Sequence, residues 1–209
     1  NKAIESTRMA LNDLNNSMPI DIISINIKEI LEHLGEITGD NVSADITGLI
    51  GQYAHGNEPS HHIAYMFNHA NQPWRTQYWA RHIMDTQYNT TPNGLSGNED
   101  CGQMSAWYVL SSIGLYPMNP ASGEYEIGSP IFEKSTIKLP ENKTFMIEAE
   151  YVSHTNFYIQ SATLNGKPFT KTTLSHQDIL KGGTLHFVMG NKPNKNWGIK
   201  NKAQQLTKK

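Results

Sequence analysis

The stretch Gly97-Asn98-Glu99-Asp100-Cys101-Gly102-Gln103-Met104-Ser105-Ala106-Trp107 passes from a turn-rich loop into an apolar segment. Residues 89–102 collect glycines, a proline and several asparagines, so they are neither helix nor strand throughout. Residues 104–113 are apolar on nearly every side, which predicts a buried helix ended by Gly114. Burial of that helix would anchor the loop before it, which favours a functional role for the loop.

A second break of the same kind lies upstream, at His55-Gly56-Asn57-Glu58-Pro59-Ser60-His61-His62. Pro59 suits the first position of a helix that continues through residues 63–67 and stops at residues 71–73. A further helix is predicted from Pro73 to about Tyr88. Carboxylates, amides and imidazoles therefore gather where two loops enter helices, and we interpret the two clusters as one active site.

The rest of the chain changes character along its length. Spacing of Ile27, Ile30, Leu31 and Leu34 predicts a helix over 26–34, and a weakly amphipathic helix is predicted over 2–16. From residue 125 the pattern becomes short alternating runs separated by turns, at 136–139, 145–149, 158–164 and 184–188. We therefore predict an α+β fold with a helical part over 1–120, an antiparallel β-rich segment over 121–198 and a polar tail over 199–209.

Composition excludes several classes of protein. The chain has 209 residues, 37% of them hydrophobic, which is enough for a substantial core. A net charge of −2 argues against binding nucleic acid, which needs a basic surface. The single cysteine, Cys101, excludes an internal disulfide and a thiolate zinc site. No apolar run is long enough to span a membrane, and because residue 1 is not Met we expect a fragment or a processed chain.

The first cluster favours a hard cation over zinc. His55, Glu58 and His61 form H-x-x-E-x-x-H, but Pro59 starts the helix after His55, so the two imidazoles do not share the zinc-protease spacing. Asn57, Glu58 and Asp100 offer the oxygen ligands that Ca²⁺ prefers, with water and sugar hydroxyls completing the set. A simpler reading makes Asn57 a helix cap, and His55 a core residue.

The second cluster contains two adjacent acids, Glu99 and Asp100, which point in different directions. One is expected to serve chemistry and the other to stabilise the start of the following helix. A plain capping loop is the simpler alternative. Cys101 beside the acids is interpreted as a small residue in a tight turn and not as a nucleophile. Among the aromatic residues, only Trp74 at a helix start is a candidate platform for a sugar ring, because the others follow core spacing.

These residues resemble the calcium-dependent exo-α-mannosidases of glycoside hydrolase family 92. The resemblance covers roughly residues 36–198, and the stretches 45–59, 72–77, 97–108 and 164–167 occur in the family's order. It implies the last helices of an (α/α)6 catalytic barrel followed by carboxy-terminal strands, so most of such an enzyme lies elsewhere in the polypeptide. It also implies a secreted, periplasmic or cell-surface location and a mannose-containing oligosaccharide or N-glycan as the partner.

The resemblance assigns roles by position. Asp100 matches the base of an inverting hydrolysis, and Asn98 stands where some members carry a second Asp, so Asn98 can position water but cannot take a proton. Asn57 and Glu58 match the calcium-binding region. Glu99 is also counted among the catalytic residues. From residue type and position, the expected substrate contacts are His55, His61, His62 and Trp74.

One part of the family pattern is missing. Residues 1–35 contain nothing like the aromatic-rich motif that carries the general acid, so we expect little or no α-mannosidase activity from the isolated chain. A calcium-dependent mannan-binding module that does not hydrolyse its ligand is the alternative, and a purely structural β-rich domain is a third reading.

Overall fold

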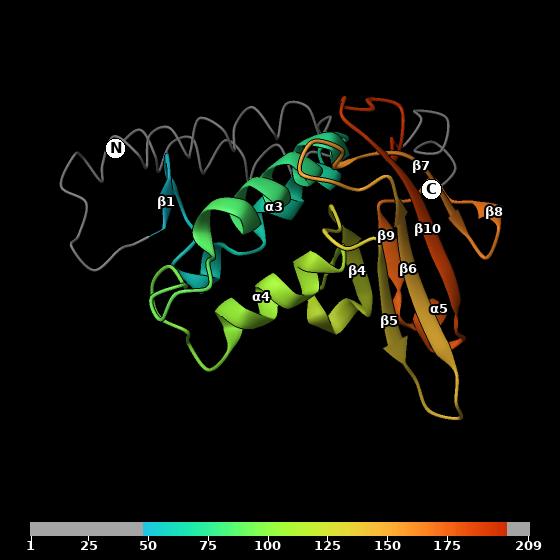
Figure 1. Ribbon diagram of the computed structural model, residues 1–209, viewed down its shortest axis with the longest axis horizontal. Coiled ribbons are helices and arrows are strands. Elements are labelled where there is room, and N and C mark those ends of the chain that lie inside the picture. Colours follow the sequence, from blue (N-terminus) through green and yellow to red (C-terminus); the bar gives the residue numbers. More distant parts are fainter. Residues whose placement is uncertain (1–47, 200–209) are drawn as a thin grey trace, which may run out of the picture.

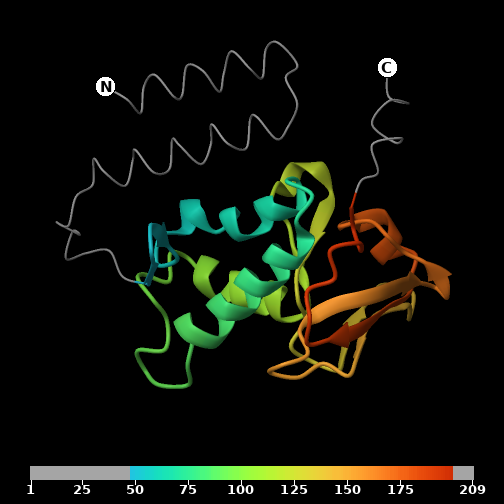
Figure 2. The same ribbon diagram turned by 90° about the horizontal axis from the view of Figure 1, so that it is seen from above.

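The computed structural model describes residues 48–199. The predicted helices over 2–16 and 26–34 lie outside this range. The two longer helices lie on one side of the molecule and most of the strands on the other (Figure 1), and the view from above places the two groups side by side (Figure 2). No helix within residues 48–199 is long and apolar enough to cross a membrane.

Two α-helices form the helical side. Helix α3 spans Pro73–Gln87, and its start at Pro73 and its end next to Tyr88 confirm the sequence prediction. Helix α4 spans Gln103–Ser112, also close to prediction. The expectation that α4 is buried all round is wrong for the described part of the chain. Met104 and Trp107 face the core, but Val109 is 57% exposed, because α4 packs on its neighbours with only one face.

The segment after Pro59 differs from the predicted α-helix. It forms two 3₁₀ helices, η1 at Glu58–Ser60 and η2 at Ile63–Asn68. Both have hydrogen bonds between residues three apart, where an α-helix has them four apart. The His61 N–H donates to the Glu58 carbonyl and the Tyr65 N–H to the His62 carbonyl, each at 3.0 Å. The break between them coincides with His61, whose side chain turns into the interior.

The strands of the described residues form three sheets. Strands β1 (Leu49–Ile50) and β2 (Tyr53–Ala54) make a small hairpin, and β3 (Leu115–Tyr116), β4 (Glu124–Ile127) and β9 (Thr173–Ser175) make a three-stranded sheet. The largest sheet has the order β5-β6-β10-β7-β8, formed by Lys134–Lys138, Thr144–Glu150, Gly183–Gly190, Tyr158–Leu164 and Lys167–Pro168. Two short helices complete the elements, η3 at Pro120–Ser122 and α5 at His176–Leu180.

The β-rich segment is not wholly antiparallel. Strand β10 pairs with β6 in parallel, from Gly183 opposite Phe145 to Val188 opposite Glu150, and with β7 in the antiparallel direction. The chain between β6 and β10 holds β7 to β9 and α5, and this long connection lets two strands run in the same direction. Alternation of apolar and polar residues predicts where a strand lies, but it does not predict which strand pairs with it or in which direction.

Two hydrophobic clusters meet at β3. Leu115 packs into the cluster of the sheets, whereas Tyr116 packs into the cluster of the helices, because successive strand residues face opposite ways. Helix α3 is also tied to the large sheet, where the side-chain oxygen of Gln77 accepts a hydrogen bond from the Ile159 N–H at 3.0 Å. Strand β3 lies before residue 120 and pairs with β4, which lies after it. The two parts of the chain therefore share a sheet, and the domain boundary between residues 120 and 121 stays a prediction.

Candidate active site

The two loop-to-helix junctions pack against each other. Gly97 has a positive φ of 73°, and a Cβ there would lie 2.3 Å from the carbonyl oxygen of Gly56. Gly48 approaches the same place, since its Cβ would lie 3.0 Å from the Gly56 nitrogen. Backbones this close leave no room for side chains, which is the physical reason for glycine at Gly48 and Gly97. The loop with residues 55–58 thus lies directly on the loop that leads to residue 100.

This packing brings Glu58 and Asp100 together. Interaction with the Glu58 carboxyl raises the pKa of Asp100, with partial desolvation and the negative charge of Glu58 acting in the same direction. Asp100 is exposed and Glu58 is half-buried, so both remain accessible from solvent. Glu58 of the first cluster and Asp100 of the second are therefore neighbours on the surface.

The backbone before α4 is unusual. Asp100, Cys101 and Gly102 all have positive φ, at 48°, 58° and 91°, and two of these residues carry side chains. Non-glycine residues adopt this conformation at a cost, and such residues concentrate at functional sites. The turn directs residues 99 and 100 apart. Glu99 points back to α4, where its Oε1 accepts a hydrogen bond from the Ser105 N–H at 3.1 Å.

The same junction contains a buried group of aromatic rings. His55 is 0% exposed and His61 is 1% exposed, and the two imidazoles stack with centroids 4.6 Å apart. The Trp107 ring meets His55 edge-on at 4.5 Å, and its Nε1–H donates to the His61 carbonyl at 3.1 Å. Burial lowers the pKa of His55 to about 3, with the charge of the neighbouring His61 as the second cause.

Both imidazoles have protein partners at both ring nitrogens. His55 contacts the hydroxyls of Tyr53 and Tyr88, at 2.8 Å and 2.6 Å. The His61 ring contacts the His55 carbonyl at 2.9 Å and the Gln103 amide at 3.2 Å. Burial lowers the pKa of His61, and the hydrogen bond to the His55 carbonyl opposes this only in part.

The structure therefore changes the expectation of sugar contacts at these histidines. Because His55 and His61 are buried and fully hydrogen-bonded, we withdraw both as substrate contacts, and the reading of His55 as a core residue fits its position. His61 lies in the break between η1 and η2, whereas His55 follows β2 and precedes η1. His62 is exposed next to them and stays a prediction as a substrate contact.

Trp74 is separated from the site by the length of α3. It lies in the first turn of that helix, whereas Tyr88, which contacts His55, follows the last residue. The rise of 1.5 Å per residue puts roughly 20 Å between these two positions. The Nζ of Lys195 lies 5.9 Å from the Trp74 ring centroid. Trp74 therefore lies away from the part of the site next to Tyr88. Its residue type alone could not indicate this separation.

The remaining predicted residues lie at the surface of the junction. Asn57 is exposed at the start of η1 and makes no side-chain capping hydrogen bond, so capping does not account for it. Asn98 and Cys101 are exposed too. Within residues 48–199, no group of three or more histidine, cysteine, aspartate or glutamate side chains is placed to hold a metal ion.

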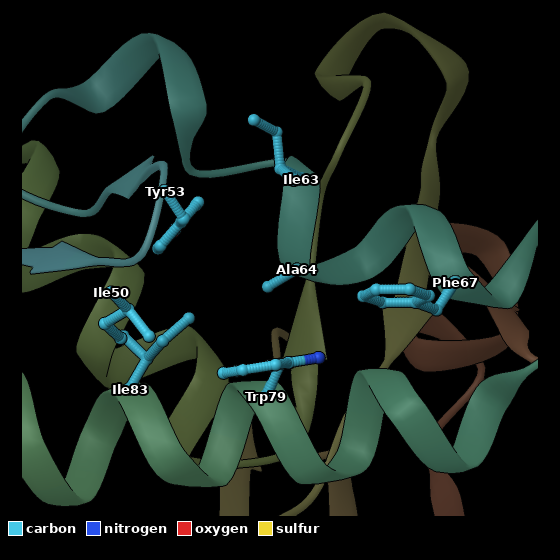
Figure 3. Close-up of a pocket in the computed structure, with 7 residues that line it drawn as sticks. All are labelled: Ile50, Tyr53, Ile63, Ala64, Phe67, Trp79 and Ile83. Atoms are coloured by element: carbon cyan, nitrogen blue, oxygen red, sulfur yellow. The ribbon is translucent and has the colours of Figure 1, made fainter. Parts of the chain in front are cut away.

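An apolar pocket of about 190 Å³ lies beside the buried rings, between η2 and α3. Figure 3 shows its side chains, which come from β1, β2, η2 and α3 and are Ile50, Tyr53, Ile63, Ala64, Phe67, Trp79 and Ile83. No carboxylate or amide side chain is among them, so this pocket lacks the groups that orient sugar hydroxyls. The candidate site is instead the open surface at Glu58 and Asp100.

Three residues that contact the histidines were missed by sequence reasoning, namely Tyr53, Tyr88 and Gln103, and a fourth, Tyr116, contacts the Gln103 amide. Tyr88 was seen only as the end of a helix, and Gln103 only as part of a motif. Tyr53 lies two residues before His55 and Gln103 three residues after Asp100, so proximity to the motifs was the available signal for these two, whereas Tyr88 and Tyr116 lie outside the motifs.

Comparison with known proteins shows which family the chain belongs to. Residues 26–191 match the glycosyl hydrolase family 92 catalytic domain, and the chain belongs to that family. A secreted glycosidase of Arthroderma benhamiae, of uncharacterised activity, is 37% identical over 146 residues, which are 68% of this chain and 19% of that protein.

Solved structures of the family are similar as well. A family 92 α-mannosidase from Bacteroides thetaiotaomicron, in complex with mannoimidazole, is 41% identical with a TM-score of 0.77, and the match covers 85% of this chain and 24% of that one. An inverting family 92 mannosidase from the same organism is 46% identical with a TM-score of 0.68, over 72% of this chain and 20% of that one. The chain thus spans about a quarter or less of the relatives it matches.

Proposed function

We propose that this chain contributes the base and the cation-binding side of an α-mannosidase active site that hydrolyses terminal α-linked mannose with inversion. The observation that carries the proposal is the meeting of the Glu58 and Asp100 carboxyls on one accessible surface, although they come from separate loops. Membership of family 92 and the similarity to an inverting mannosidase of that family support it. The (α/α)6 barrel belongs to the same proposal, because the described residues span only a part of the relatives.

Asp100 is the proposed base. An inverting enzyme needs a carboxylate that takes a proton from water while an acid protonates the leaving oxygen, with the two carboxyls ~6.5 to 9.5 Å apart. Glu58, which interacts directly with Asp100, is not assigned as that acid. We assign the acid to no described residue. Asn98 is proposed to orient the water, and Glu99 to hold the turn through Ser105.

Glu58 and Asn57 are the proposed calcium ligands. The donors fit a hard cation in kind, since a carboxylate and an amide oxygen are accessible at one loop and the Asp100 carboxyl is adjacent. The same geometry disfavours zinc, because His55 and His61 are committed to hydrogen bonds inside the protein. When bound, a calcium ion supplies positive charge against sugar hydroxyls. Ca²⁺ takes 6–8 oxygens, so water, sugar and other parts of the polypeptide would complete the set.

Mannose-containing oligosaccharides are the proposed substrates. One similar α-mannosidase was solved with mannoimidazole, and a similar fungal glycosidase is secreted. We therefore propose an extracellular, periplasmic or cell-surface location, where such glycans are found. His62, exposed beside η2, is the proposed substrate contact of the first cluster.

Hydrolysis of an aryl α-mannoside tests the function directly. We expect turnover by the full polypeptide that carries this chain, and little by residues 1–209 alone, because no acid is assigned here. An aryl β-mannoside is the control, since a site built for the α-anomer should not cleave it. If the full polypeptide binds α-1,2-mannobiose without cleaving it, the mannan-binding alternative replaces the hydrolase.

Calcium is expected to stabilise the protein. A ligand that binds only the folded state at a hundredfold above its Kd adds ~2.7 kcal/mol to the free energy of unfolding. We expect calcium to raise the melting temperature of the chain, EDTA to reverse this, and Glu58→Gln to remove the response. Glu141→Gln is the matched control, because Glu141 is exposed and pairs with Lys143 far from the site. An equal calcium response in Glu58→Gln would contradict the ligand assignment.

A further inference from the structure

A chain of hydrogen bonds runs beneath the two carboxyls, and its donors and acceptors can be assigned. The Tyr88 hydroxyl donates to the Met104 carbonyl at 3.0 Å, so its hydrogen is used. The 2.6 Å contact between Tyr88 and His55 Nε2 therefore needs a hydrogen on Nε2. A neutral His55 then accepts at Nδ1 from the Tyr53 hydroxyl, at 2.8 Å.

The second imidazole follows the same logic. His61 Nε2 lies 2.9 Å from the His55 carbonyl, which can only accept, so this nitrogen carries the hydrogen. His61 Nδ1 then accepts from the Gln103 amide at 3.2 Å. Each ring has one donor and one acceptor, and each is satisfied. One pattern of neutral tautomers therefore fits the entire group.

This network joins the segments that carry the two acids. Tyr88 connects the end of α3 to the first turn of α4 through Met104, and to the η1 loop through His55. Gln103 connects the first residue of α4 to His61, on the other side of η1. Along the chain, Glu58 lies three residues from both histidines, and Asp100 lies three residues before Gln103. Glu58 thus projects from a short segment that the network holds at both ends, and Asp100 from a segment that it holds on the carboxy-terminal side.

We propose that His55, His61, Tyr88 and Gln103 are positioning residues that set the separation of the Glu58 and Asp100 carboxyls. The inference rests on the proposed function of these acids, and none of the four residues is assigned a contact with sugar or cation. Apolar side chains of the same shape would fill this space but would accept several arrangements of the loops. Buried polar groups accept only those arrangements in which every donor meets its acceptor.

Disulfide formation between the two acid positions reports their separation. Cysteines replace both acids, as Glu58→Cys and Asp100→Cys, in the full 209-residue chain with Cys101→Ser to remove the native thiol. A disulfide needs Cβ atoms ~3.5 to 4.5 Å apart, so its rate under a fixed oxidant depends on how often the loops reach that geometry. We expect ready oxidation in this parent, and oxidation slower by on the order of tenfold when Tyr88→Phe or Gln103→Met is added.

Two control variants accompany the measurement, one expected to leave the rate unchanged and one expected to lower it. Tyr125→Phe also removes a tyrosine-to-histidine contact, with His176 at 3.2 Å, but in the β-rich part of the chain, so it should leave the rate unchanged. Gly97→Ala forces a Cβ against the Gly56 carbonyl and should slow the reaction by separating the loops. Far-ultraviolet circular dichroism identifies variants that are folded, and Gln103→Met tests the proposal independently of Tyr88→Phe.

The outcomes separate the inference from the function. If Gly97→Ala slows oxidation while folded Tyr88→Phe and Gln103→Met react like the parent, the positioning role is wrong. A parent that does not oxidise would also overturn it, because the loops would then not bring residues 58 and 100 together even transiently. The reaction involves no sugar, cation or turnover, so the expected rates would uphold the positioning role even if the full polypeptide hydrolysed no mannoside.

Discussion

Replacing Asp100 with asparagine is expected to lower kcat for α-mannoside hydrolysis by on the order of 10³-fold in the full polypeptide, because general-base catalysis contributes ~10² to 10⁴-fold. Asparagine has nearly the same shape and can keep a contact with Glu58, but it cannot take a proton from water. Asp100 is exposed at the end of its loop, so the change leaves no buried group without a partner. The loss should therefore fall on kcat, with KM and the melting temperature little changed.

Glu99→Gln is the matched control beside Asp100. Glutamine keeps the Oε1 that accepts the Ser105 N–H, so the turn is retained while the charge is lost. We expect a change in kcat of only about a few-fold, because Glu99 is proposed to hold the turn and not to move a proton. Initial rates on an aryl α-mannoside measure both variants. Full activity in Asp100→Asn, or a loss in Glu99→Gln as large as that expected for Asp100→Asn, would reverse the two assignments.

Acid is expected to destabilise the chain through the buried imidazoles. The pKa of His55 is about 3 in the folded protein and about 6.5 in an unfolded chain. Between these values the unfolded state binds more protons, so stability is complete above pH 6.5 and falls as the pH decreases towards 3. His55 alone would contribute a slope of up to ~1.4 kcal/mol per pH unit, and the lowered pKa of His61 adds to it in the same direction.

Urea unfolding at a series of pH values from 7.5 to about 4 measures this effect as a fall in the free energy of unfolding. His55→Gln removes one titrating ring, so its curve should begin lower at neutral pH and decline less steeply. His154→Gln is the control, because His154 is exposed and its loss should leave the slope of the parent. A His55→Gln variant with the parent's slope would show that this ring does not titrate on unfolding.

The local elements of this protein follow from short-range sequence signals. Pro73 begins α3 because proline suits the first turn of a helix, and the alternation in residues 145–149 and 184–188 corresponds to β6 and β10. The sequence also places Asp100 and Glu58 at two loop-to-helix junctions, whereas their proximity depends on how those junctions pack. The glycines at positions 48 and 97 were visible too, but their close approach to Gly56 was not.

The direction in which a side chain points was harder to predict. Three imidazoles within eight residues indicated a site, yet the 3₁₀ turns bury His55 and His61 and leave His62 outside. Trp74 had the residue type of a sugar platform but lies at the far end of α3. Residue type is a local property, whereas exposure depends on which distant segment covers the residue.

The sequence alone determined the two longer helices after residue 72, the β-rich second half and the acids at two helix entrances, since each depends on neighbouring residues. Tertiary structure decided that β6 and β10 run in parallel, that the histidines hydrogen-bond to Tyr88 and Gln103, and that Glu58 interacts with Asp100. These features join residues distant along the chain. Their energies depend on packing and on the satisfaction of buried polar groups, which no short stretch of sequence specifies.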